Sequence, residues 1–249
     1  MTRTGEPLAG RAEVLAAAGD HTYVRLTTAG DPAGGGVTGF RLGTDTVVWF
    51  GAGPGGPVGY ALGDGVRAAR FFASTGSDGP VPRPRHLHLP DVPTPVLAPH
   101  LAFTRIGRWL FLDTAAPPSA CPGEDAVVPL TAADHDAIDE LLDDVLPDST
   151  TRPGDARVAG WYGIRAGGRL VACGADRSRG DVGFLASLAV ARDAQGRGLG
   201  GALTTALTRR LVDRYGRASL GVYVENVGAI RLYRRLGYTG ALPRTSLSL

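Results

Sequence analysis

The chain has 249 residues, of which 43% are hydrophobic and 20% charged, and its formal net charge is +2. This length allows one large domain or two smaller ones, and the composition argues against disorder. A charge so close to zero gives no general attraction to nucleic acids or membrane surfaces. All 26 basic residues are arginine, which we interpret as coding-sequence bias rather than as selection for anion binding.

Cysteine content and hydropathy favour a protein of the cytoplasm. Cys121 and Cys173 are the only cysteines, and two distant cysteines form neither a disulfide framework nor a zinc cluster by themselves. The N-terminal stretch lacks the apolar core of a secretion signal, and no apolar run reaches the ~18 residues of a membrane span. We therefore expect a soluble, cytoplasmic protein without nucleic-acid or membrane partners, whose oligomeric state stays open.

The first half of the chain is rich in glycine and proline and shows few regular patterns. The predicted elements are three strands, at 22–28, 46–51 and 108–114, and a helix near Val66 to Ala73. The proline-rich segment 76–99 is predicted to hold no helix. A second break at 114–126 sets the expected domain boundary. We expect a smaller N-terminal domain, 1–118, which is an accessory domain or a degenerate copy of a second domain at 119–249.

The second half begins with clear patterns. A strand at 126–130 precedes a helix that Thr131 can cap, with Asp134 at the third position and apolar residues at helical spacing as far as Val145. A Gly-Gly pair then joins two apolar strands, which predicts a hairpin of 158–166 and 169–177.

The remaining elements surround a glycine-rich stretch. A buried strand at 182–191 precedes it, and leucines at every fourth position make 199–215 an amphipathic helix with Gly216 as its C-cap. A strand at 218–224 follows, and then a helix that Asn226 begins and Gly237 ends. The expected order of this half is β-α-β-β-β-α-β-α-β, with mixed strand directions.

The glycine-rich stretch, "QGRGLGGAL" at 195–203, has the spacing G-x-G-x-x-G. A P-loop is excluded, because it requires a lysine and the chain has none. A dinucleotide site is suggested by Glu225, which lies 24 residues after Gly201. Two observations argue against it: five residues separate the strand from the first glycine, and only 24 residues follow Glu225, too few for a doubly wound sheet.

A third interpretation is a site for the pyrophosphate of an acyl-coenzyme A. Residues 195–200 have the form [QR]-x-x-G-x-[GA] directly before an amphipathic helix. Backbone N–H groups without obstructing β-carbons can point at phosphate oxygens, and the helix N-terminus adds partial positive charge. Arg197 offers a charge-assisted contact in addition, or is a solvated loop residue.

Two motifs together resemble a known family. "LASLAVARDAQGRGLGGALTTAL" resembles the acetyl-CoA-binding motif of the GNAT superfamily of N-acetyltransferases, and "NVGAIRLYRRLGY" resembles that family's next motif. The second motif is matched by Asn226, Ala229, Tyr233, Leu236, Gly237 and Tyr238. The resemblance covers about residues 124–249. It implies an α/β (α+β) fold whose mixed, mostly antiparallel sheet is flanked by helices.

The resemblance also implies roles for particular residues. One backbone N–H of the strand before the loop would polarise the thioester carbonyl, and Tyr233 would protonate the leaving thiolate. Asn226 would lie near the pantetheine or cap its helix. The residues that the resemblance assigns to acetyl-CoA are Leu188, Ala189, Val190, Gln195, Gly196, Arg197, Gly198, Leu199, Gly200, Gly201, Asn226 and Ala229.

The implied reaction is direct transfer of an acetyl group from acetyl-CoA to a primary amine of a small molecule or peptide. The amine must first lose a proton, which requires a base or a water relay. By residue type and rough position, the candidates are Glu225, Asp181 and Asp148. Ser187 and Tyr162 line the acceptor pocket or serve as turn and core residues. The alternative function is a non-catalytic acyl-CoA sensor.

Other chemistry-bearing residues suggest no further site. His86 and His88 form the only close histidine pair and lack a neighbouring cysteine or carboxylate cluster, so no metal site is predicted. Cys121 lacks a recognisable partner for nucleophilic catalysis, and Cys173, inside a strand, is expected in the core.

Overall fold

The computed structural model describes residues 5–29, 36–53, 56–75, 81 and 83–249. The chain divides into two compact units. The first consists of Met1–Phe111, Val222–Glu225 and Ala241–Leu249, and the second of Leu112–Gly221 and Asn226–Gly240. The predicted division after residue 118 differs from these units at the C-terminal end, because the last strand of the chain pairs with a strand of the first unit.

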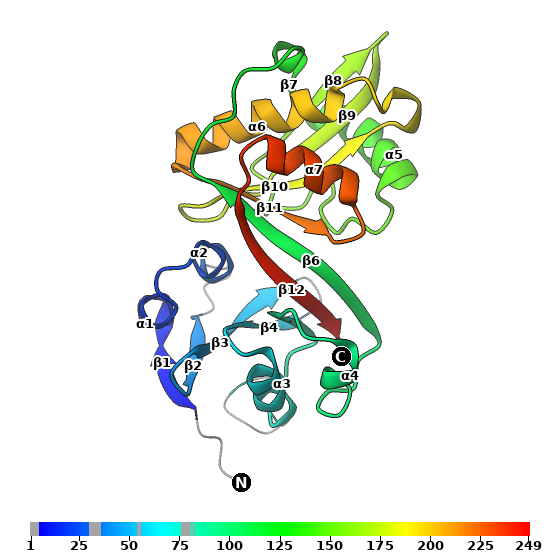
Figure 1. Cartoon of the computed structure of the whole chain (residues 1–249). Coiled ribbons are helices and arrows are strands. Elements are labelled where there is room, and N and C mark those ends of the chain that lie inside the picture. The colour runs from blue at the N-terminus through cyan, green and yellow to red at the C-terminus, as the bar shows by residue number, and fades with distance from the viewer. Residues whose placement is uncertain (1–4, 30–35, 54–55, 76–80, 82) are drawn as a thin grey trace. The chain divides into compact units, whose positions relative to one another are not determined.

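The first unit is a mixed sheet with short helices (Figure 1). Its strands are ordered β1-β2-β3-β4-β5-β12-β6. Among the described pairings of β1 to β5 and β12, only that of β4 with β5 is parallel. Its elements are β1 (Glu6–Ala9), α1 (Gly10–Ala17), α2 (Thr22–Thr28), β2 (Thr38–Leu42), β3 (Thr46–Gly53), β4 (Gly56–Leu62), α3 (Gly65–Ala73), β5 (His86–Pro90), α4 (Thr94–Leu97), most of β6 (Arg105–Thr114) and of β12 (Gly240–Ser248).

Alternation along the strands gives the first unit two different faces. Val48 and Phe50 of β3 join the apolar core that contains Phe71 and Phe72 of α3. Trp49, between them, instead stacks on Tyr60 of β4 with ring centroids 5.7 Å apart. Successive side chains of a strand point to opposite faces of the sheet, so the apolar residues of β3 are buried on both faces. The predicted strands at 46–51 and 108–114 and the predicted helix at 66–73 are confirmed.

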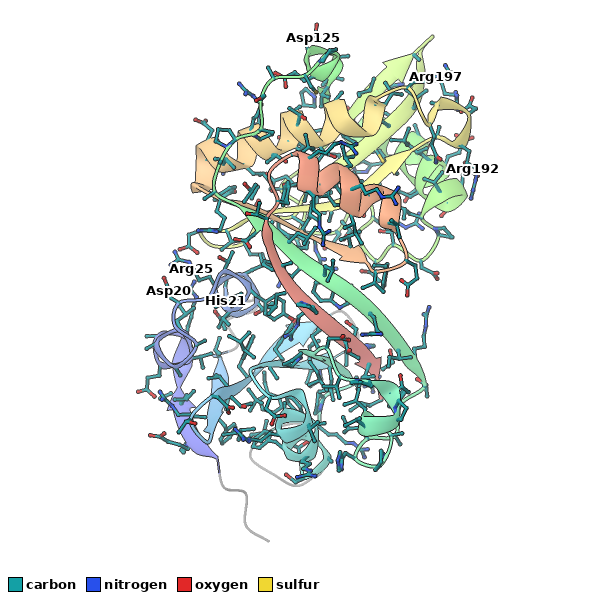
Figure 2. The ribbon with its side chains drawn as sticks, viewed as in Figure 1. Asp20, His21, Arg25, Asp125, Arg192 and Arg197 are labelled. Atoms are coloured by element: carbon teal, nitrogen blue, oxygen red, sulfur yellow. The ribbon has the colours of Figure 1, made fainter. Side chains whose placement is uncertain are left out.

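The predicted strand at 22–28 is wrong, because these residues form α2. Nδ1 of His21 accepts a hydrogen bond from the backbone N–H of Tyr23 and caps the helix (Figure 2). The hydroxyl of Thr28 donates to the Val24 carbonyl at 2.6 Å, an intrahelical bond available to threonine despite its preference for strands. Burial of Tyr23 and Val24 against the unit outweighs that local preference.

The proline-rich segment 76–99 does contain a helix, against expectation. The four-residue α4 follows Pro93 and has a proline in its first turn, where the missing N–H has no intrahelical partner to lose. The same segment also supplies β5. Residues 76–80 and 82 lie outside the described part of the chain.

The second unit is a sheet ordered β7-β8-β9-β10-β11, in which only β10 and β11 are parallel. Figure 1 shows α6 and α7 together on one face of this sheet and α5 on the other. Its elements are β7 (Val128–Leu130), α5 (His135–Val145), β8 (Gly160–Ala166), β9 (Arg169–Asp176), β10 (Gly183–Val190), α6 (Leu199–Tyr215), β11 (Ala218–Tyr223), α7 (Val227–Arg235) and the single turns η1 (Glu124–Ala126), η2 (Ala132–Asp134) and η3 (Arg192–Ala194).

The predicted order of the second half is confirmed in full. Thr131 and Asp134 form a reciprocal capping box, in which the Asp134 carboxylate accepts from the Thr131 N–H at 2.7 Å. Gly167 and Gly168 both have positive φ, as the tight turn of the predicted hairpin requires. Gly216 ends α6 in the left-handed conformation, and Cys173 is fully buried.

The two units repeat one order of elements. In each, a strand and a helical segment come first, and three antiparallel strands follow. A helix then leads to a strand that is parallel to the third of these, and another helix comes after it. The crossing helix is α3 in the first unit and α6 in the second. Among the residues described, no helix is both long and apolar enough to cross a membrane.

Candidate functional site

The glycine-rich stretch forms the loop between η3 and α6. Gly196 and Gly198 have φ values of +76° and +82°, a conformation that costs other residues free energy. A Cβ placed on either glycine would meet no atom within 4 Å. The glycines are therefore required by backbone conformation, and the space beside them is open to a ligand.

The N-terminus of α6 has no side-chain cap. Gly198 is its N-cap residue and offers no side-chain acceptor to the N–H groups of the first turn. The helix is 17 residues long, so its dipole adds partial positive charge at this end. Unpaired N–H groups and positive potential together suit an anion such as a pyrophosphate.

Two side chains of the loop bond back to it. Gln195 donates from Nε2 to the Val190 carbonyl at 3.0 Å, and Arg197 donates from Nη2 to the Asp193 carbonyl at 2.9 Å (Figure 2). Both residues are exposed. These bonds hold the loop's shape and leave its backbone N–H groups as donors for a ligand.

Gly200 and Gly201 belong to the first turn of α6 rather than to the loop. A Cβ on either would lie 3.8 Å from a methyl group of Leu232 on α7, which is ordinary contact. A side-chain methyl group would therefore fit at either position, so the packing of α6 on α7 does not itself require glycine. The sequence motif did not identify Leu232, because its spacing in α7 is that of any apolar helix residue.

Strand β10 separates from β11 before the loop, while it stays paired with β9 as far as Val190. Its parallel pairing with β11 ends at Leu185↔Leu220, and its register with β9 shifts between Ala186 and Ala189. Ser187, inside this bulge, has a φ of +49°, a strained value for a residue with a side chain. Leu188, Ala189 and Val190 therefore lie beyond the last paired residue on the β11 side.

The bulge is tied to the segment that follows α5. The hydroxyls of Ser187 and Ser149 are 2.7 Å apart, and Ser187 also donates to the Thr151 carbonyl at 3.2 Å. Arg152 of this segment donates to the Asp143 carboxylate of α5 at 2.7 Å. It also donates to the Ser149 carbonyl within the segment at 3.2 Å. Sequence reasoning missed Ser149, Thr151 and Arg152, because no periodicity marks an irregular segment.

Tyr233 is buried in α7 with only 7% of its surface exposed. Burial raises the pKa of its phenol to about 12, so the group keeps its proton at neutral pH. No hydrogen bond to its hydroxyl is found among the described residues. The neighbouring Tyr238, 6.0 Å away between ring centroids, bonds instead to Thr208 at 2.8 Å.

Asn226 caps α7. Its Oδ1 accepts a hydrogen bond from the Ala229 N–H at 3.1 Å, which is the capping role that the sequence left open. Ala229 contributes this backbone group rather than a side chain. The pair positions the start of α7, the helix that carries Tyr233.

The other candidates do not converge on one point. Glu225, Asp181 and Asp148 are all exposed, and of these Asp148 directly precedes the Ser149 that bonds to the bulge. The Tyr162 ring lies under the Arg210 guanidinium of α6 at 5.0 Å. His86 and His88 bond through Nδ1 to Ser248 and Ser246 of β12.

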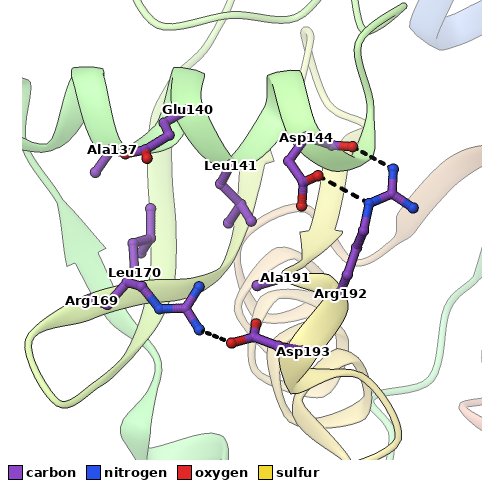
Figure 3. A pocket seen from close by; sticks show the side chains of 9 residues that line it. All are labelled: Ala137, Glu140, Leu141, Asp144, Arg169, Leu170, Ala191, Arg192 and Asp193. Atoms are coloured by element: carbon purple, nitrogen blue, oxygen red, sulfur yellow. Dashed lines mark hydrogen bonds and ion pairs between the residues drawn. The ribbon is translucent and has the colours of Figure 1, made fainter.

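A cavity of about 380 Å³ lies between α5 and the turn before the loop (Figure 3). Two ion pairs cross it, Arg192–Asp144 at 3.0 Å and Arg169–Asp193 at 2.5 Å. Hydrogen bonding to Arg169 lowers the pKa of the Asp193 carboxyl. All four side chains are exposed, so each pair contributes little stability, but both bear on the turn from which the loop begins.

Comparisons with known proteins agree with this geometry. The family model "Acetyltransferase (GNAT) family" matches residues 130–238. A solved structure from Novosphingobium aromaticivorans, described as a GNAT-family acetyltransferase, is 23% identical with a TM-score of 0.56, over 87% of this chain and 89% of that one. A GCN5-related N-acetyltransferase from Kribbella flavida is 19% identical with a TM-score of 0.50, over 85% and 86%.

A Drosophila protein is also similar, at 17% identity and a TM-score of 0.53, over 85% of this chain and 78% of that one. At such identities the likeness concerns the fold alone, and it extends over both halves of the chain. No curated protein sequence matches.

Proposed function

We propose that the protein transfers the acetyl group of acetyl-CoA to a primary amine, because residues 130–238 match the GNAT acetyltransferase family model. The acceptor is a small molecule or a peptide. Its amine attacks the acetyl carbonyl of acetyl-CoA directly, so no acyl-enzyme forms. The protein would act in the cytoplasm. The match to the family supports acyl transfer in general.

The observation that carries the proposal is the open loop at the start of α6. Two glycines with positive φ leave free space in front of the uncapped helix N-terminus, which supports binding of the pyrophosphate. Gln195 and Arg197 hold the loop through carbonyl groups rather than blocking it. Directly upstream, β10 beyond Leu185 is free of β11, which supports binding of an extended arm along that edge.

Acetyl-CoA supplies an activated acetyl group on a thiol leaving group. A backbone N–H of residues 188–190 would donate a hydrogen bond to the carbonyl oxygen as negative charge develops there. Removal of one such donor has cost about 3–4 kcal/mol in other enzymes. The bulge and the strained Ser187 fix the direction of this backbone, because they lie where β10 separates from β11.

Tyr233 is the proposed acid. As the carbon–sulfur bond breaks, its hydroxyl would donate its proton to the sulfur, while the amine nitrogen forms the new bond to carbon. Its raised pKa keeps the proton in place until the sulfur becomes basic. The amine's own proton would leave to water or a carboxylate, and Asp148 is the candidate in the segment bonded to the bulge.

The proposal is tested by ligand binding and turnover. Acetyl-CoA should raise the melting temperature by mass action and NADH should not. Release of free thiol with a panel of primary amines should then identify the acceptor class. Binding of acetyl-CoA without turnover on any amine would support the alternative, a non-catalytic acyl-CoA sensor, and stabilisation by NADH alone would contradict both.

A further inference from the structure

Each unit contains a fork where two parallel strands stop pairing. In the first unit, β4 and β5 pair over three residues and separate after Tyr60↔His88. In the second, β10 and β11 also pair over three residues and separate after Leu185↔Leu220. In both units the crossing helix begins shortly after the first strand of the fork ends. The two forks are therefore equivalent positions in the repeated order.

Arg244 of β12 fills the fork of the first unit. Its Nη2 donates to the Ala61 carbonyl on β4 at 2.7 Å and to the His88 carbonyl on β5. These two carbonyls lie at the point where the strands part. The guanidinium thus joins the two strands in place of the backbone pairing that has ended.

The arginine is held there at a cost. It is fully buried, its Nε and Nη1 have no hydrogen-bond partner, and no carboxylate pairs with it among the described residues. Burial lowers the pKa of the guanidinium. Partial compensation comes from the Tyr23 ring of α2, whose centroid lies 4.4 Å from the guanidinium carbon. A buried charge without an ion pair is rare, so its position in the fork calls for an explanation other than fold stability.

The helix N-terminus of the first unit is occupied as well. Asp64 is the N-cap of α3, and its Oδ1 accepts from the N–H groups of Val66 at 2.8 Å and Arg67 at 3.0 Å. The equivalent residue before α6 is Gly198, which caps nothing. A carboxylate at this place removes two donors and repels a second anion.

We propose that the first unit is closed to acyl-CoA by the protein's own side chains, with Arg244 in the fork and Asp64 at the helix N-terminus. The chain therefore binds one acetyl-CoA, in the second unit. The inference rests on the proposed function, and it assigns that function to one of two equivalent positions.

Titration calorimetry of the full chain with acetyl-CoA tests the number of sites. We expect one molecule per chain, binding at least about 100-fold weaker in Gly198→Asp and thus undetected at the concentration that saturates the wild type, and unchanged binding by Asp64→Ala. Two molecules per chain, or one remaining in Gly198→Asp, would overturn this inference alone. No binding by the wild-type chain would overturn the proposed function together with it.

Hydrogen exchange tests the role of Arg244 itself. In Arg244→Met, the backbone amides of 61–64 and 88–91 should exchange at least tenfold faster, and those of β10 should be unchanged. Equal exchange in both proteins would show that the guanidinium does not close the fork. If this variant fails to fold, the count of sites in Gly198→Asp still decides the inference.

Discussion

The first unit begins its crossing helix with an aspartate, and the second begins the same helix with a glycine in the left-handed conformation. Asp64 satisfies two N–H groups of α3, whereas the corresponding groups of α6 have no side-chain partner. One residue at one position thus decides whether a helix N-terminus is finished by the protein or left for an anion.

The strands before these helices differ in the same sense. Strand β4 keeps a continuous register with β3 from Gly53↔Gly56 to Val47↔Leu62. Strand β10 instead shifts its register with β9 and places Ser187 at positive φ. A bulge re-aims the backbone at the price of local strain. One topology thus forms either a stable scaffold or a candidate binding site through a few local differences in sequence.

The largest expected effect comes from giving the second unit the first unit's cap. Gly198→Asp should weaken acetyl-CoA binding by at least about 100-fold, because its carboxylate would take the helix N–H groups and repel the pyrophosphate, at a strain of about 1–3 kcal/mol. Gly198→Asn is the matched control with the same shape and no charge. Calorimetry at low and high salt should show a larger loss for aspartate, and equal losses would remove the electrostatic part of the explanation.

The next largest effect concerns Tyr233, which belongs to the second unit alone. Tyr233→Phe should lower kcat by about 100-fold or more, the range of general acid catalysis, and change acetyl-CoA affinity by less than about twofold. Steady-state kinetics with saturating amine separates the two parameters. Tyr238→Phe, which loses the bond to Thr208 instead, is the control. An unchanged kcat in Tyr233→Phe would exclude the acid role.

A smaller, pH-dependent effect should arise in the first unit at His88. Burial first, and then the charges of Arg244 and His86, lower its pKa to about 3. The Trp109 indole can only donate to the Ser246 hydroxyl, at 2.7 Å, so the Ser246 proton points to Nδ1 of His88 at 2.6 Å. The folded imidazole is therefore neutral, with its own proton on Nε2.

The sign of the pH effect follows from this lowered pKa. Between about pH 6.5 and 3 the unfolded chain binds a proton at His88 that the folded chain does not bind. The contribution of neutral His88 to the stability of the fold is therefore complete above pH 6.5 and is lost as the pH falls. The free energy of unfolding should decrease by at most about 1.4 kcal/mol per pH unit. Urea unfolding at pH 7 and pH 5 measures it, and the same slope in His88→Gln would contradict the assignment.

The smallest effect is expected at Gly200. Because an added Cβ would make only ordinary contacts with Val190 and Leu232, Gly200→Ala should change acetyl-CoA affinity by less than about twofold. It should also stabilise α6 by up to about 1 kcal/mol, since alanine favours a helix more than glycine. A large loss of affinity in thermal-shift titrations would mean that the ligand needs the space at Gly200 itself.

The second unit could be predicted element by element because its signals are local. The capping box at Thr131, the glycines of the hairpin turn and the leucines of α6 act within a few residues of themselves. In the first unit, by contrast, tertiary contacts outweigh some of the local sequence preferences. The segment 22–28 has the composition of a strand, yet the His21 cap and the burial of Tyr23 make it a helix.

By itself, the sequence determined the order of the second unit and the loop that begins α6, since positive φ at Gly196 and Gly198 is a property of single residues. The tertiary structure alone decided which of two equivalent forks stays open. Arg244 reaches the Ala61 carbonyl across 183 positions of sequence, and no local pattern encodes a contact of that separation, because only the paired strands bring its partners together.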